Sequence, residues 1–123
     1  MALPETGDQI VLLHNPRCSK SRATLELLTE RGVHFDVRPY LEAPLSKPEL
    51  VRLAERLGCS ASGFVRAKEA AFADAGCGPE SSEDEILEAM ARFPILMERP
   101  ILVRGERAAI GRPPEDVLAL LSG

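Results

Sequence analysis

The feature that most constrains this chain is the junction between a short apolar run, residues 10–13, and a helical pattern over residues 24–31. The loop between them, residues 14–22, reads HNPRCSKSR. Its asparagine–proline pair is typical of a turn, which favours a buried strand for the apolar run before it. We therefore expect a strand, then a loop, and then the start of a helix.

Cys18 lies at this strand-to-helix junction. The first backbone N–H groups of a helix and the positive end of its dipole favour an anion there. The nearby cations Arg17, Lys20 and Arg22 act in the same direction, so we predict a lowered thiol pKa and a nucleophilic thiolate. The same amides and cations could hold an oxyanion. The alternative is an ordinary turn with solvated basic residues.

The flanking segments predict a strand–helix–strand unit. The helix has an apolar stripe from residue 23 to residue 28 and ends at Gly32. Val33, Phe35 and Val37 then alternate with polar residues, including Arg38, as in a half-buried strand. We expect the two strands to be parallel, with a right-handed crossover.

The middle of the chain predicts a helical insertion. Capping boxes at Ser46 and Ser82 begin two helices, the first of which ends at Gly58 and the second before Pro94. Between them, residues 64–68 look helical and residues 75–79 look like a loop.

The last third predicts an antiparallel hairpin of residues 101–103 and 108–110. A final helix follows, with Val117, Leu118 and Leu121 on its inner side. Pro100 directly precedes a strand, and the sequence does not determine its peptide isomer. This order of elements suits one mixed sheet covered by helices, an α/β fold.

Composition excludes several classes of protein. The 123 residues are 45% hydrophobic and 28% charged, as expected for one domain spanning residues 1–123, of which we expect 1–8 to be a disordered leader. No apolar run reaches a membrane span, and the start lacks a signal peptide, so we expect a cytoplasmic monomer that binds no membrane. The net charge of −4 argues against nucleic-acid binding.

The three cysteines, Cys18, Cys59 and Cys77, are odd in number and widely spaced, which predicts reduced thiols rather than a disulfide framework. We expect no metal site, because no His/Cys cluster is present. Cys59 is interpreted as an apolar filler and Cys77 as a loop residue. Ser21 occupies the position where a resolving cysteine would complete C-x-x-C.

The loop pattern His-Asn-Pro-x-Cys-x-x-Ser-Arg resembles the active-site loop of the thioredoxin-fold, glutaredoxin-coupled arsenate reductases. The resemblance covers almost the whole chain. It implies a thioredoxin-like fold, with a mixed four-stranded sheet and a helical insertion between its strand–helix–strand and strand–strand–helix halves. It makes Cys18 the nucleophile and Pro100 the cis-proline beside it. It also implies three oxyanion-binding arginines, Arg66, Arg99 and Arg112, and a supporting loop of His14, Asn15, Arg17, Ser19, Ser21 and Arg22.

The resemblance further implies reduction of arsenate to arsenite, with glutathione as co-substrate, glutaredoxin as partner and no bound cofactor. The GRPP run at residues 111–114 is similar to a short branch of this family. Two alternatives stay open. One is a general single-cysteine thiol-disulfide oxidoreductase, and the other is a redox-responsive transcription regulator, which the missing C-x-x-C disfavours.

Overall fold

The computed structural model describes residues 3–4, 7 and 9–121. The chain forms two compact units, the first from Met1–Ala43 with Arg99–Gly123 and the second from Pro44–Glu98. The predicted leader, residues 1–8, falls mainly outside the described residues, although Leu3 is buried. Within the described ranges, no helix combines the length and apolar composition that crossing a bilayer requires.

A four-stranded mixed sheet forms the centre of the first unit, with strand order β2-β1-β3-β4. Strand β1 (Ile10–His14) pairs parallel with β2 (Asp36–Pro39) and antiparallel with β3 (Ile101–Arg104). Strand β4 (Arg107–Ile110) extends the sheet as the predicted hairpin with β3. The strand order therefore confirms the predicted mixed sheet.

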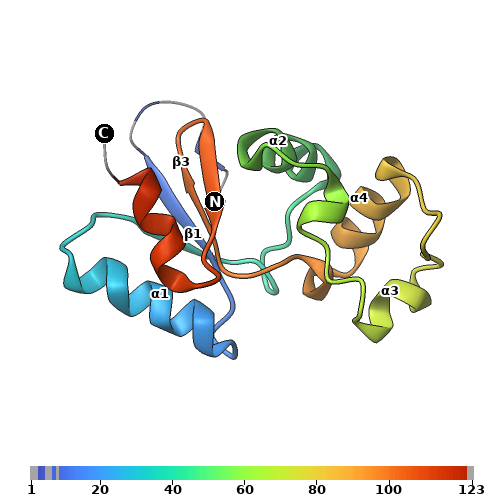
Figure 1. Cartoon of the computed structure of the whole chain (residues 1–123), viewed down its shortest axis with the longest axis horizontal. Coiled ribbons are helices and arrows are strands. Elements are labelled where there is room, and N and C mark those ends of the chain that lie inside the picture. The colour runs from blue at the N-terminus through green and yellow to red at the C-terminus, as the bar shows by residue number, and fades with distance from the viewer. Residues whose placement is uncertain (1–2, 5–6, 8, 122–123) are drawn as a thin grey trace. The chain divides into compact units, whose positions relative to one another are not determined.

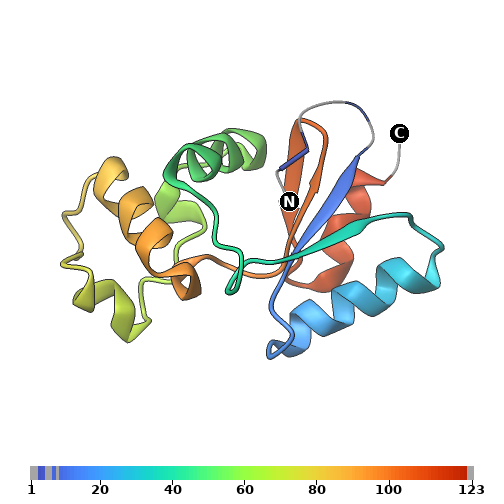
Figure 2. The same ribbon diagram turned by 180° about the vertical axis from the view of Figure 1, so that it is seen from behind.

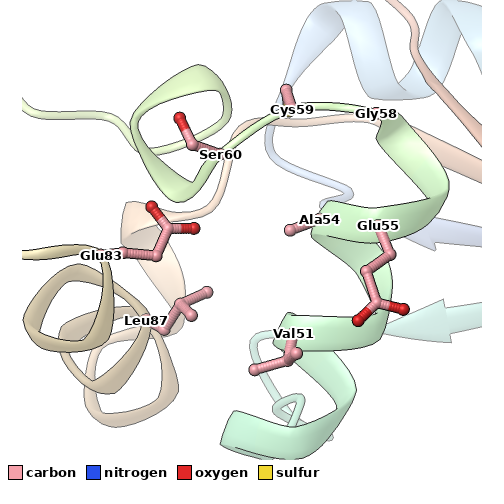
Figure 3. A pocket seen from close by; sticks show the side chains of 8 residues that line it. All are labelled: Val51, Ala54, Glu55, Gly58, Cys59, Ser60, Glu83 and Leu87. Atoms are coloured by element: carbon pink, nitrogen blue, oxygen red, sulfur yellow. The ribbon is translucent and has the colours of Figure 1, made fainter.

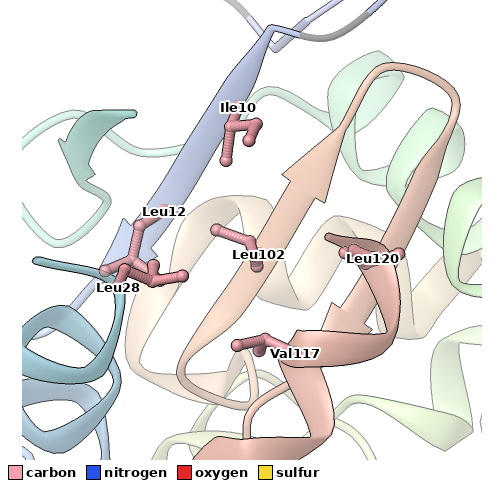
Figure 4. Packing of buried hydrophobic residues seen from close by; sticks show 6 residues of the cluster. All are labelled: Ile10, Leu12, Leu28, Leu102, Val117 and Leu120. Atoms are coloured by element: carbon pink, nitrogen blue, oxygen red, sulfur yellow. The ribbon is translucent and has the colours of Figure 1, made fainter. Parts of the chain in front are cut away.

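Two helices cover one face of this sheet, α1 (Ser19–Glu30) and the C-terminal 3-10 helix η3 (Pro114–Leu120). Figure 1 shows them in front of the strands, and in Figure 2 the strands lie in front of them. Leu28 of α1 and Val117 of η3 pack on the sheet residues Leu12 and Leu102 (Figure 4). Each fully buried leucine stabilises the fold by about 1.5–3 kcal/mol, so this apolar cluster holds α1 and its N-terminal loop against the sheet.

Strand β2 differs from its predicted position and pattern. It begins at Asp36 rather than Val33, although Val33 and Phe35 still pack against the apolar cluster. Arg38, predicted to point outward, is buried, and its Nε donates a hydrogen bond to the carbonyl oxygen of Ala43 at 2.9 Å. A buried guanidinium is tolerated when a carbonyl oxygen accepts its hydrogen bond. The alternation of apolar and polar residues in the sequence does not predict that acceptor.

The second unit is helical, as predicted. Helices α2 (Lys47–Leu57) and α4 (Glu83–Arg92) both begin with complete capping boxes, at Ser46 and Ser82. A short 3-10 turn η1 (Ala61–Gly63), helix α3 (Ala70–Asp74) and a second 3-10 turn η2 (Pro94–Leu96) complete it.

The predicted helix over residues 64–68 is wrong. Val65 instead forms an antiparallel bridge with Met97, and the helical turn comes later, in α3. Backbone pairing with a distant segment overrides the weak local helix signal here. The loop over residues 75–79 is confirmed.

The last predicted helix is present as a 3-10 helix, and its buried face differs slightly. Val117 and Leu120 are buried, whereas the predicted Leu118 and Leu121 are half-buried. The tighter 3-10 winding brings residues i and i+3 onto one side, which favours this pair.

Two glycines allow a test of backbone conformation alone. Gly58 ends α2 in the left-handed region, with φ +71°, whereas the φ of Gly78 lies outside that region. A Cβ added at either glycine would meet no atom within 4 Å. We predict that Gly58→Ala destabilises the protein by about 1 kcal/mol, because side chains disfavour the left-handed region. Gly78→Ala is the matched control, expected to be neutral or slightly stabilising. Equal unfolding free energies in urea titrations of the two variants would contradict this account.

Candidate active site

The loop after β1 is held by Ser21, which is fully buried. Its Oγ accepts a hydrogen bond from the backbone N–H of Asn15 at 3.0 Å and shares another with Nδ1 of His14 at 2.7 Å. The Asn15 side-chain oxygen accepts from the backbone N–H of Arg17 at 2.9 Å. A serine three residues after Cys18 therefore serves as an internal brace for the loop.

His14 is buried at the end of β1, where burial first and the charge of Arg22 second lower its pKa. A neutral imidazole bonded to Ser21 fits the supporting role in the loop that the family resemblance implies for His14. Arg22 is exposed, and its Nη1 donates to the carbonyl oxygen of Pro16 at 2.9 Å.

Cys18 is the N-cap residue of α1, with an extended backbone (φ −97°, ψ 124°) and no side-chain capping bond. Partial burial raises the pKa of its thiol. Hydrogen bonds from the backbone N–H of Ser21, the side chain of Arg99 and the backbone N–H of Lys20 outweigh burial, and the charge of Arg99 assists them. The net pKa is lowered, as predicted from the helix start.

The cation beside the thiol differs from the sequence expectation. Arg17, Lys20 and Arg22, on which that expectation rested, are exposed, and Arg99 is the side chain that lowers the Cys18 pKa. Antiparallel pairing explains its position: Leu13 is opposite Ile101, so the loop that follows β1 meets the segment that precedes β3. Arg99 and Cys18 are far apart in the sequence, so the local pattern around Cys18 did not predict this contact.

Arg112 lies with Arg99 in the first unit. Its Nη1 donates to the carbonyl oxygen of Arg99 at 3.2 Å. The neighbouring Gly111 donates its N–H to Pro100, and a Cβ at Gly111 would come within 2.8 Å of the Pro100 ring and 2.9 Å of Thr24 Oγ1. Only glycine fits this close approach, which fixes the backbone next to Arg112. The Arg99–Pro100 bond, whose isomer the sequence left open, is cis.

Arg66 belongs to the second unit. Its guanidinium forms ion pairs with Glu69 at 3.2 Å and with Glu98 at 3.0 Å. Neither carboxylate was predicted. Glu69 had a weak signal in its i,i+3 spacing from Arg66, whereas nothing in the sequence pairs Arg66 with Glu98.

The remaining predicted residues are surface groups. Ser19 is the first residue of α1 and is exposed, like Arg17. The structure thus brings Cys18 and Arg99 together and ties Arg112 to the Arg99 backbone. For Arg66, contact with an oxyanion stays a prediction.

Cys59 and Cys77 are half-buried free thiols of the second unit. Burial first and the charge of Glu83 second raise the pKa of Cys59. Cys59 lines a cavity of about 480 Å³ between α2 and α4, into which Val51 and Leu87 project from opposite sides (Figure 3). None of the predicted site residues lines this cavity. Among the described residues, no group of three or more His, Cys, Asp or Glu side chains could hold a metal ion.

Chemically, the first unit offers a thiol whose ionised form is stabilised by helix amides and one guanidinium. Such a thiolate can attack an electrophilic centre. Fork-shaped guanidiniums bind tetrahedral oxyanions through paired, charge-assisted hydrogen bonds. The arrangement therefore suits a nucleophilic reaction on a small anion.

Comparison with known proteins gives consistent similarities. Residues 13–120 match the ArsC family. A protein of Neisseria meningitidis serogroup A (strain Z2491) named arsenate reductase is 44% identical over 115 residues, covering 92% of this chain and 98% of that protein. The uncharacterized protein YfgD of Escherichia coli (strain K12) is 46% identical over 115 residues, covering 92% of this chain and 97% of its own length.

Solved structures agree with the fold. The arsenate reductase from Vibrio cholerae superposes with a TM-score of 0.86 at 41% identity, covering 93% of this chain and 98% of that one. A putative arsenate reductase from Yersinia pestis superposes with a TM-score of 0.84 at 42% identity, covering 90% of this chain and 99% of that one. The predicted thioredoxin-like fold is confirmed by this likeness.

The role of Arg99 can be tested against the loop cations. In a background where Cys59 and Cys77 are serine, we predict that Arg99→Ala raises the Cys18 pKa, because one hydrogen bond and one positive charge are lost. The rate of alkylation by iodoacetamide at neutral pH should fall severalfold. Arg17→Ala is the control, expected to leave the pH–rate profile unchanged. A larger rise of the Cys18 pKa in Arg17→Ala than in Arg99→Ala would show that the loop cations, and not Arg99, stabilise the thiolate.

Proposed function

The chain belongs to the ArsC family, and on that basis we propose that it reduces arsenate to arsenite, with Cys18 as the nucleophile. The observation that carries the proposal is the lowered pKa of Cys18 at the start of α1, beside Arg99. A thiolate is the form that attacks arsenic, and its formation near neutral pH is the first requirement of the reaction.

We propose that Arg66, Arg99 and Arg112 bind the arsenate oxygens. Arg99 would then serve twice, since the guanidinium that stabilises the free thiolate can stabilise the negative charge on the oxyanion during attack. The hydrogen bond from Arg112 to the Arg99 carbonyl supports this assignment, because it holds two of the three arginines on neighbouring backbone.

In the proposed reaction, the Cys18 sulfur forms a bond to arsenic while one oxygen leaves as water, taking up protons. Glutathione then supplies a second thiolate. The two thiols together give two electrons to As(V), which leaves as arsenite, and their sulfurs remain joined as a mixed disulfide. Glutaredoxin reduces that disulfide by thiol exchange and regenerates Cys18.

An external thiol is proposed because Cys18 lacks a local partner. Position 21 is a serine, and its buried hydroxyl braces the loop. We further propose a cytoplasmic monomer with no bound cofactor. A reducing compartment would keep the free thiols reduced and supply glutathione.

The direct test is arsenate-dependent NADPH oxidation with glutathione, glutaredoxin and glutathione reductase. Cys18→Ser should reduce turnover to background, because no other thiol is placed at the α1 start. Cys59→Ser with Cys77→Ser is the matched control, expected to retain most of the activity.

Two outcomes would count against the mechanism. Activity lost in the Cys59→Ser, Cys77→Ser variant would indicate an internal disulfide relay. Turnover on a small mixed disulfide but none on arsenate would favour the alternative, a general single-cysteine thiol-disulfide oxidoreductase.

A further inference from the structure

Arg66 is paired with two carboxylates. Its Nε and Nη2 each lie 3.2 Å from Oε1 of Glu69, and its Nη1 lies 3.0 Å from Oε1 of Glu98. The three side chains are 24%, 31% and 25% exposed, in the order Arg66, Glu69, Glu98. All three guanidinium nitrogens therefore face a carboxylate oxygen, in a partly desolvated setting where charge interactions are stronger than at a free surface.

Backbone hydrogen bonds keep these groups in place. The N–H of Arg66 donates to Leu96 at 2.6 Å, and the N–H of Glu98 donates to Phe64 at 2.8 Å, on either side of the Val65–Met97 bridge. The N–H of Glu69 donates to the carbonyl oxygen of Arg66 at 3.1 Å. Because the backbones are fixed, the two carboxylates are held beside the guanidinium, where they take up to three of its five N–H donors.

The charges of this cluster oppose an anion. The carboxylates of Glu69 and Glu98 repel an oxyanion, although Arg66 alone would attract one. Burial lowers the pKa of Arg66, but the bonds and charges of Glu69 and Glu98 raise it overall, so the guanidinium stays protonated. A dianion is repelled by the carboxylates more strongly than a monoanion, since Coulomb energy scales with charge.

We infer that Glu69 and Glu98 are built-in competitors of the oxyanion for Arg66, and that they set its affinity. They take N–H donors of the guanidinium when no anion is present, and their negative charges repel an anion that approaches it. They are positioning residues that act through Arg66. This inference rests on the proposed function, in which Arg66 contacts the oxyanion.

The test measures anion binding by calorimetry in a Cys18→Ser background, where no reaction occurs. Sulfate and arsenate serve as dianionic probes and nitrate as the monoanionic probe, all at one ionic strength. Glu69→Gln and Glu98→Gln keep the side-chain shape and remove the charge. Each should tighten sulfate and arsenate binding about tenfold, and nitrate binding less.

Glu88→Gln is the matched control, since Glu88 is an exposed carboxylate of α4 and its loss changes the net charge equally. Its affinities should stay within about twofold of the parent protein. In an Arg66→Ala background, Glu98→Gln should no longer tighten sulfate binding, because the competition is for that guanidinium. Thermal midpoints check folding, and Glu69→Ala and Glu98→Ala give a second, shorter substitution at each position.

Unchanged, weaker or undetectable sulfate binding in both glutamine variants would overturn the inference, and weaker binding would mean that the carboxylates orient Arg66 for the anion. A gain that persists without Arg66 would overturn it too. The outcome is separable from that of the proposed function. Arsenate turnover by the parent protein with unaltered affinities in the variants refutes the competition alone, whereas tighter binding without turnover refutes the reduction alone.

Discussion

The structure depends on one junction, where β1 ends and α1 begins with Cys18 as its N-cap. A helix start must satisfy its first N–H groups, and here the N–H groups of Ser21 and Lys20 stabilise the negatively charged form of the Cys18 sulfur. The buried hydroxyl of Ser21 ties the strand end to the helix. Replacing Ser21 by a resolving cysteine would remove these hydrogen bonds. The one serine therefore both supports the loop and leaves Cys18 without a local thiol partner.

The cation at the junction comes from sheet pairing. Arg99 is far from Cys18 in the sequence, and the antiparallel register of β1 with β3 places the two segments at the same end of the sheet. Arg112 follows β4 in the same hairpin and bonds to the Arg99 carbonyl. The active-site charges of the first unit therefore depend on strand register, which the apolar cluster beneath α1 and η3 stabilises.

Sequence patterns predicted the features that local physics determines. The capping boxes at Ser46 and Ser82, the hairpin and the position of Cys18 at a helix start all rest on short-range signals. The predictions that failed depend on distant partners: Val65 pairs with Met97, and Arg38 is buried against a carbonyl. For the same reason, the sequence predicted that the loop cations lower the Cys18 pKa, whereas the side chain that does so is Arg99. The two carboxylates that pair with Arg66 were not predicted either.

The helix start and Arg99 lower the pKa of Cys18, whereas burial raises the pKa of Cys59. The most direct measurement is a pH titration of the Cβ resonances of Cys18 and Cys59 by ¹³C NMR in the unmodified protein. We expect a Cys18 midpoint below the free-thiol value of about 8.5 and a Cys59 midpoint above it. A Cys18 midpoint equal to or above that of Cys59 would contradict it.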